Sequence, residues 1–316
     1  MAAENLNIMG RQETFVDCFS LLYLTDSHTG NDGTGWGQHP IRPDLLPQVI
    51  AALRQRMTTC PVDMILHGGD ITDTGSVEQQ LQVKKLWSQL PASIRLCLGN
   101  HDLDGQESPK NWLANVPEFF EDSALDYMIE CGQVDVYVLA CGWLNEHDKV
   151  TRWSNPGYSV QPGILPTQLE WLAGLLKSRS HRPAIMAIHA PLDPLPPTLT
   201  GQEEPIHLTE PSYTQPIINL LNQSPNVKLV LSGHCHATCL TRHGNRVHLT
   251  TSAFCEPPFQ IREITIEDNM IRVRSINPVD YEQLQVVCHS ENLWSFGKDC
   301  DLTVNIPINK PMRYKY

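Results

Sequence analysis

The chain has 316 residues, of which 41% are hydrophobic and 18% charged, and its formal net charge is −12 at pH 7. This length permits one large domain, or one domain with a small appendage, in an ordinary globular protein. The negative charge argues against a broad nucleic-acid or anionic-membrane surface, because such surfaces need clustered Lys and Arg. A phosphate ligand would need another source of positive charge, and bound divalent cations are the obvious candidate.

The chain shows no targeting or membrane-spanning pattern. The N-terminal stretch MAAENLNIMGRQETF has no charged region followed by an apolar segment, and no run of about 18 apolar residues occurs. We therefore expect a cytoplasmic protein. The ten cysteines are scattered without a C-x-x-C pair, which favours buried free thiols over disulfides.

Short apolar runs alternate with amphipathic patterns along most of the chain. The runs that predict strands are 20–25, 63–68, 94–99, 134–140, 184–189, 227–233, 260–266 and 270–276. Helical patterns cover 43–57 and 76–90, and capping boxes at Ser76/Gln79 and Thr167/Glu170 predict helix starts. This alternation predicts an α/β fold with much of its sheet buried on both faces.

We predict a main domain over residues 15–277. Residues 278–316 form a C-terminal extension that either packs on this domain or makes a small appendage. Two stretches, 29–40 and 190–211, are long and rich in Gly or Pro, and such loops are more often functional than idle. Candidate rim loops contain Trp36, His39, Trp143 and His207. Each of these residues could contact the substrate, by stacking on a base or by a hydrogen bond to a phosphate. The alternative for each is a surface or packing role.

Five of the apolar runs end in residues that can bind metals. In open α/β sheets, ligands collect at the carboxyl ends of the strands, so we expect these residues to meet in one crevice. In chain order they are Asp26, His28, Asp70, Asn100, His101, His189, His234 and His236.

The stretch GHCH at 233–236 has three interpretations: a structural turn, a thiolate-containing zinc site, or half of a catalytic centre. Residues i and i+2 of an extended segment point to the same side, so His234 and His236 can face the crevice together while Cys235 points away. The same holds for Asp26 and His28. Carboxylate, amide and imidazole donors suit Mn, Fe, Co, Ni or Zn. A turn or a buried histidine explains each motif alone, but their joint occurrence favours a two-ion centre.

The motifs DSH (26–28), GDITD (69–73), GNHD (99–102), HAP (189–191) and GHCH (233–236) resemble the ordered signature of the calcineurin-like metallophosphoesterases. The resemblance covers roughly residues 20–240 and fills every signature position. It implies a four-layer αββα sandwich of two mixed β-sheets flanked by helices. It also implies two divalent transition metal ions, Mn, Fe, Co or Zn. The first would be held by Asp26, His28, Asp70 and His236. Asp70 would bridge to the second, held with Asn100, His189 and His234.

The resemblance places His101 over the substrate rather than on a metal. There it could stabilise developing charge or protonate the leaving oxygen, with Asp102 orienting it. The attacking nucleophile would be hydroxide bridging the two ions. Purple acid phosphatases have a tyrosine ligand three residues after the bridging aspartate, where this chain has Asp73. We therefore expect no violet colour, and expect Asp73 to orient a ligand rather than to be one.

The block GDITDTGS, with GNHD and HAP, resembles the class III cyclic nucleotide phosphodiesterase and glycerophosphodiesterase branch more than the protein Ser/Thr phosphatases. This implies an enzyme that hydrolyses a small phosphodiester such as a 3′,5′-cyclic nucleotide, and related diesterases often form homodimers. Thr29-Gly30 and Ala190-Pro191 depart from common relatives at the crevice rim, which leaves the substrate open. One alternative is a phosphomonoesterase or nucleotide pyrophosphatase on the same centre. Another is a non-catalytic protein-binding scaffold, although such scaffolds usually lose His101 or metal ligands.

Overall fold

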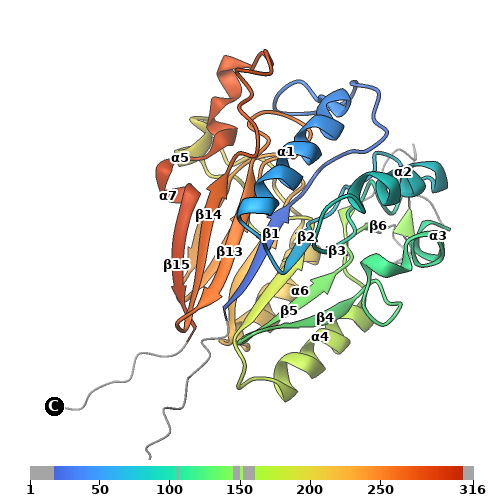
Figure 1. The fold of residues 1–316 in the computed structure, drawn as a ribbon. Coiled ribbons are helices and arrows are strands. Elements are labelled where there is room, and N and C mark those ends of the chain that lie inside the picture. Colours follow the sequence, from blue (N-terminus) through green and yellow to red (C-terminus); the bar gives the residue numbers. More distant parts are fainter. Residues whose placement is uncertain (1–17, 105–106, 145–149, 152–160, 309–316) are drawn as a thin grey trace, which may run out of the picture.

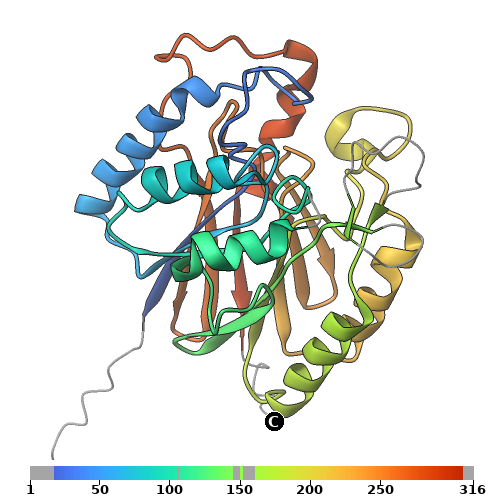
Figure 2. The ribbon, with the colours of Figure 1, turned by 90° about the vertical axis from the view of Figure 1, so that its right-hand side faces the viewer.

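Two six-stranded mixed β-sheets pack face to face, with helices on both outer faces (Figures 1 and 2). The structure is a computed structural model that describes residues 18–104, 107–144, 150–151 and 161–308. Residues 15–17 of the predicted domain and 309–316 of the predicted extension lie outside the described residues. The αββα sandwich of two mixed sheets is confirmed.

The first sheet contains strands from early and late in the described part of the chain. β1 is central, pairing in parallel with β2 and antiparallel with β13. The strand order is β15 (Thr303–Pro307), β14 (Met270–Ile276), β13 (Ile261–Glu267), β1 (Phe19–Leu24), β2 (Met64–His67) and β3 (Ser93–Leu96). β15 comes from the C-terminal extension and pairs antiparallel with β14 at the sheet edge. The domain boundary at residue 277 stays a prediction.

The second sheet has a parallel centre and antiparallel edges. β5, β9, β10 and β12 run parallel, while β4 and β11 pair antiparallel at the two edges. The strand order is β11 (Cys239–His243), β12 (Arg246–Thr250), β10 (Val227–Ser232), β9 (Ala184–Ile188), β5 (Val134–Leu139) and β4 (Tyr127–Cys131). A small third sheet contains β7 (Val150–Thr151), β6 (Trp143–Leu144) and β8 (Gln161–Pro162).

The helices cover the outer faces of the sheets. α1 (Leu46–Thr59), α2 (Val77–Trp87) and α3 (Ser108–Asn115) lie on the side of the first sheet, and α4 (Pro166–Ser178) and α6 (Pro211–Asn222) lie over the second (Figures 1 and 2). The short elements are η1 (Pro43–Leu45), η2 (Pro117–Phe119), α5 (Pro197–Thr200), η3 (Ser290–Phe296) and α7 (Asp299–Leu302). Within the described part of the chain, no helix has the length and apolar character to cross a membrane.

Burial on both faces explains why the strands read as continuous apolar runs. Along β9 and β10, Ile185 and Leu229 belong to the core that includes the inter-sheet layer. Their neighbours Met186 and Val230 pack with the apolar faces of α4 and α6. Alternate residues therefore face different apolar layers, and only Lys228 and Ser232 of β10 are polar among the residues of these two strands.

The predicted helix starts have mixed outcomes. Ser76 caps α2, because its hydroxyl accepts a hydrogen bond from the backbone N–H of Gln79. The start predicted from Thr167 is wrong, since α4 begins at Pro166, whose fixed φ suits the first helical position. The ten cysteines are all free, and six of them are buried, as predicted for most, whereas Cys18, Cys60 and Cys300 are exposed and Cys288 is partly exposed.

Candidate metal centre

The motif residues meet at one edge of the sandwich. Asp26 and His28 follow β1, and Asp70 follows β2. Asn100 follows β3, His189 follows β9, and His234 and His236 follow β10. Each sheet therefore contributes side chains, and the expected convergence at the carboxyl ends of the strands is what the structure shows.

Left-handed backbone, not extended backbone, aims most of these side chains. Positive φ angles occur at Asp26 (56°), His28 (43°), Asp70 (51°), His234 (68°) and His236 (51°). This region is uncommon for non-glycine residues, costs of the order of 1–3 kcal/mol each and clusters at functional sites. The predicted side-by-side placement is correct, but the strand-alternation argument for it is wrong, because β1 and β10 end before these residues.

Backbone hydrogen bonds hold two of the strained turns together. The N–H groups of Asp26 and His28 donate to the carbonyls of Gly69 and Asp70 at 2.9 and 3.0 Å. The contacts between β1 and β2 thus continue past the ends of both strands. Gly99 permits the close approach of the next turn, since a Cβ there would collide with Asp70 Oδ1 and the His189 ring.

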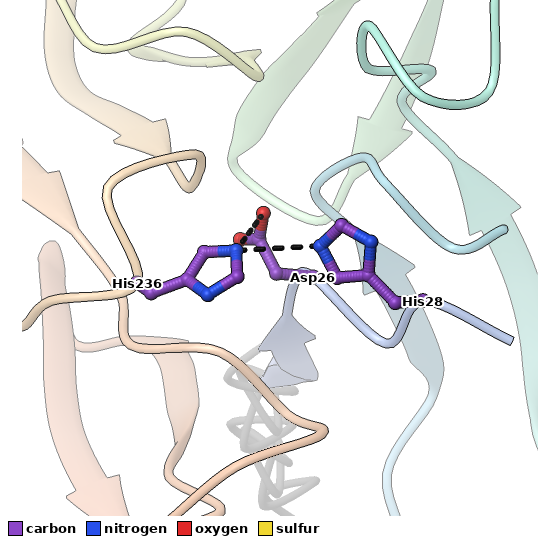
Figure 3. Close-up of side chains that lie close together, drawn as sticks. All are labelled: Asp26, His28 and His236. Carbon is purple, nitrogen blue, oxygen red and sulfur yellow. Dashed lines mark hydrogen bonds and ion pairs between the residues drawn. The ribbon is translucent and has the colours of Figure 1, made fainter. Parts of the chain in front are cut away.

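The first set of donors contains Asp26, His28 and His236 (Figure 3). His236 Nε2 lies 3.3 Å from His28 Nε2 and 3.4 Å from Asp26 Oδ1. All three side chains are buried. Two imidazole nitrogens that face each other beside a carboxylate, away from water, form a donor set that suits a transition metal ion.

The second set contains Asp70, His189 and His234. His189 Nε2 lies 2.9 Å from Asp70 Oδ2 but has no well-oriented hydrogen-bond partner in the described part of the chain, although it is fully buried. Its Nδ1 donates to the carbonyl of Gly68, which directs Nε2 towards the carboxylates. An ion at this point would satisfy that nitrogen, so the donor set fits a second metal.

Asp26 contacts a histidine of each set. Its Oδ1 lies 3.4 Å from His236 Nε2 and 3.8 Å from His189 Nε2. Asp70 also contacts the turn after the neighbouring strand β3, because its Oδ1 accepts the backbone N–H of His101 at 2.9 Å. The bridging role of Asp70 stays a prediction.

Protons hold the metal-free centre together. Burial by itself lowers the pKa of both histidines, but Asp26 and Glu256 raise the pKa of His236 to about 10. In the same way, Asp70 and Asp26 raise the pKa of His189 to about 9. Burial raises the pKa of the two aspartates. His236 and His189 nevertheless lower the pKa of Asp26 below the ordinary value, and His189 and His101 do the same for Asp70. A divalent cation can take the place of these protons.

His101 lies beside the donors, and the backbone orients it. Its Nδ1 is 2.6 Å from the carbonyl oxygen of Asp73. The expectation that Asp102 orients His101 is wrong within the described residues. The buried Asp102 carboxylate instead accepts hydrogen bonds from the backbone N–H groups of Thr72 and Gly99 at 2.9 and 3.0 Å. Asp102 therefore joins the GDITD loop to the GNHD loop.

Asp73 lies next to His28 and His101, but it belongs to neither the first nor the second donor set. Its Oδ1 is 3.4 Å from His28 Nδ1 and 4.0 Å from His101 Nδ1, and it accepts a hydrogen bond from Asn31 at 2.8 Å. This placement agrees with the expected role of orienting a ligand.

Five of the predicted metal ligands line a cavity of about 510 Å³: His28, Asp70, Asn100, His234 and His236. Trp36, Trp143 and His207 also line it, as expected for rim residues. The Trp36 ring is 55% exposed, with its centroid 5.1 Å from that of His236 and 5.2 Å from that of His207. The rim prediction is wrong for His39, which is buried beside Ser295.

The cysteine of GHCH is outside the centre. Cys235 is fully buried in an apolar cluster with Leu195 and Ala237, and burial raises its pKa well above the ordinary value. The thiolate interpretation is therefore excluded, as the sequence predicted.

One residue that contacts a predicted metal ligand was not predicted from the sequence. Glu256 is fully buried, and its Oε1 lies 2.5 Å from His236 Nδ1. The only signal was an acidic residue directly after the apolar residues Phe254 and Cys255.

Another histidine cluster has a different character. Asp193, His243 and His248 lie close together. However, His248 is engaged at both nitrogens, because Arg246 donates to Nε2 at 3.0 Å and Asp193 accepts from Nδ1 at 2.6 Å. A hydrogen-bond network explains this cluster without a metal.

Two mixed sheets with carboxylate and imidazole donors between their strand ends define a two-metal hydrolase architecture. Residues 19–238 match the model of the family described as calcineurin-like phosphoesterase. The chain belongs to this dimetal family. It is accordingly a metal-dependent phosphoric ester hydrolase, and the family acts on small phosphate esters.

Solved structures share the fold. A dimetal phosphatase from Danio rerio has a TM-score of 0.64 at 12% identity, covering 92% of this chain and 99% of its own. A purple acid phosphatase from yellow lupin (Lupinus luteus) seeds has a TM-score of 0.56 at 13% identity, with coverage of 92% and 54%. GAP50, the anchor in the inner membrane complex of Plasmodium, has a TM-score of 0.54 at 12% identity, with coverage of 93% and 90%. No curated protein matches the sequence. These identities support a shared fold alone.

Proposed function

We propose that the protein hydrolyses a small phosphodiester, such as a 3′,5′-cyclic nucleotide, with two divalent transition metal ions. The observation that carries this proposal is the convergence of carboxylate, amide and imidazole side chains from both sheets on the cavity that His101 lines. The motifs GDITDTGS and HAP support the diesterase branch.

The donor sets suggest how the ions would be held. The first ion would take Asp26, His28 and His236, and the second would take Asn100, His189 and His234, with Asp70 between them. Mn, Fe, Co or Zn suits this mixture of oxygen and nitrogen donors. When bound, the ions supply positive charge that polarises the phosphoryl group and lowers the pKa of water.

His101 serves as the proton donor in this proposal. A carbonyl oxygen only accepts hydrogen bonds, so the contact with Asp73 places a hydrogen on Nδ1. Nε2 is then the nitrogen that exchanges a proton. The leaving oxygen of the substrate needs a proton donor of this kind as its bond to phosphorus breaks.

The aromatic rim supports an aromatic group on the substrate. Trp36 and Trp143 line the same cavity, and their rings lie near His236 and His234 respectively. A nucleobase can stack on an exposed indole while its phosphate reaches the donors below.

Assays with matched substrates test the proposal. Metal-loaded protein is given bis(p-nitrophenyl) phosphate, cyclic AMP, p-nitrophenyl phosphate and ATP, with an Asp70→Asn variant as control. We expect faster turnover of the diesters. Faster turnover of the monoester or of ATP would favour a phosphomonoesterase or pyrophosphatase, and no turnover above the control, without bound metal, would favour a scaffold.

A further inference from the structure

Glu256 determines which nitrogen of His236 faces the first donor set. Its buried carboxylate lies 2.5 Å from His236 Nδ1, on the opposite side of the ring from the contacts with Asp26 and His28. A carboxylate at Nδ1 keeps the hydrogen there and leaves Nε2 as a free electron pair for a metal. Glu256 is thus placed to position His236 without touching an ion.

His39 holds Glu256 in turn. Its backbone N–H donates to the other carboxylate oxygen of Glu256 at 2.5 Å. Its ring is fixed at both nitrogens, because Nδ1 accepts the backbone N–H of His289 at 3.1 Å and Nε2 donates to the Ser295 hydroxyl at 3.0 Å. The partners of this ring all belong to a segment near the C-terminus.

We call this segment, residues 289–296, the C-terminal clasp. It also contacts the loop that carries His236, since the carbonyl of Ser295 accepts a hydrogen bond from the N–H of Thr238 at 2.8 Å. Asn292 donates to the carbonyl of Gln38 at 2.7 Å, and the Gln38 side chain donates to the carbonyl of Cys235 at 3.1 Å. Figures 1 and 2 place the clasp, drawn in red, beside the blue loop after β1.

We propose that the C-terminal clasp, acting through His39 and Glu256, positions His236 and so sets the affinity of the first metal site. The clasp lies outside residues 19–238, which match the family. This inference rests on the proposed two-metal function. It adds that residues about fifty positions beyond His236 tune one of the two ions.

The test measures metal binding directly. Metal-free protein is titrated with Mn²⁺, and bound metal per chain is followed by calorimetry and elemental analysis. In Glu256→Gln we expect the affinity of one ion to fall by about 10–100-fold while the other is unchanged. Ser295→Ala and Asn292→Ala should weaken the same ion by a smaller factor. Glu291→Gln, an exposed change within the clasp, should match wild type.

A second readout separates positioning from general damage. At saturating Mn²⁺ the turnover of Glu256→Gln should return towards the wild-type value, because excess metal refills a weakened site. Wild-type affinity for both ions in all three variants would overturn the inference. If Glu256→Gln does not fold, Ser295→Ala and Asn292→Ala decide the question. A wild-type protein that binds no Mn²⁺ would instead contradict the proposed function.

Discussion

The Nδ1 atom of His101 lies 2.6 Å from the backbone carbonyl of Asp73, so this histidine is oriented by the main chain. Replacing His101 with Ala should leave both ions bound and reduce turnover by about 10²–10⁴-fold, the usual contribution of a general acid. Turnover and elemental analysis are measured on the same preparation. The exposed His181→Ala change serves as control. Loss of metal in His101→Ala would show that the residue is a ligand.

Asn100 is assigned to one ion only. Asn100→Ala should therefore weaken the binding of one ion and leave the other near its wild-type affinity, because the proposal assigns the amide oxygen to the second ion alone. Stepwise titration of metal-free protein distinguishes the two sites, and the exposed Asn219→Ala change is the control. Equal weakening of both sites would contradict the proposed division of ligands.

Metal uptake should release protons. His189 and His236 have pKa values raised to about 9 and 10, so both are protonated in the metal-free protein at pH 7. Imidazole binds a metal only in its neutral form, so the apparent metal affinity should rise with pH across this range. Calorimetry in buffers of different ionisation enthalpy counts the released protons. Heats that do not depend on the buffer would contradict the prediction.

The stability of the metal-free protein should change in the opposite direction. A raised pKa stabilises the folded state fully below the unfolded value of about 6.5, and this contribution disappears as the pH rises through the folded values. The melting temperature of chelator-treated protein should therefore fall between about pH 6.5 and pH 10. Metal-loaded protein should show a smaller decrease, and equal decreases would count against the prediction.

Asp135 is a structural carboxylate remote from any donor set. Its fully buried oxygens accept from Arg179 Nε and Arg182 Nε, each at 2.7 Å. Asp135→Asn should lower the free energy of unfolding by about 3 kcal/mol, the low end for a broken buried pair because both arginines are partly exposed. Glu130→Gln is the control, since its contact with Arg179 is exposed and worth below about 1 kcal/mol. Urea unfolding measures both, and equal losses would contradict this account.

Trp36 should discriminate between substrates. Trp36→Ala removes the exposed ring at the cavity rim, and the KM for cyclic AMP should rise about tenfold, the equivalent of one stacked base. The KM for a diester without an aromatic group should change little. The Leu208→Ala change, at an exposed residue that follows His207 in sequence, is the control. An unchanged KM for cyclic AMP would place the base elsewhere.

Much of the fold was predictable because the central strands are short apolar runs, whereas edge strands such as β11 (CLTRH) and β15 (TVNIP) lack such a run. The predicted range 270–276 coincides with β14 (Met270–Ile276), and the other predicted strands match within a few residues. The residues that end these runs could be located in the crevice from sheet geometry alone. Their left-handed backbone could not, since Asp26 and His236 carry no local sign of a positive φ.

The supporting contacts were less visible in the sequence. Asp102 was expected to orient His101, but the turn directs its carboxylate to the backbone of Thr72. Glu256 lies twenty positions from His236 and outside any motif. Contacts of this kind depend on how distant loops pack, and one sequence contains no pattern that reports them.

The origin of the donors in both sheets has a mechanical meaning. Asp26 and Asp70 extend from the first sheet, and His189 and His236 from the second. With ions in place, metal ligation would link the two sheets of the sandwich, and metal binding would stabilise the folded state. A shortage of transition metals would then switch off the chemistry and shorten the survival of the protein together.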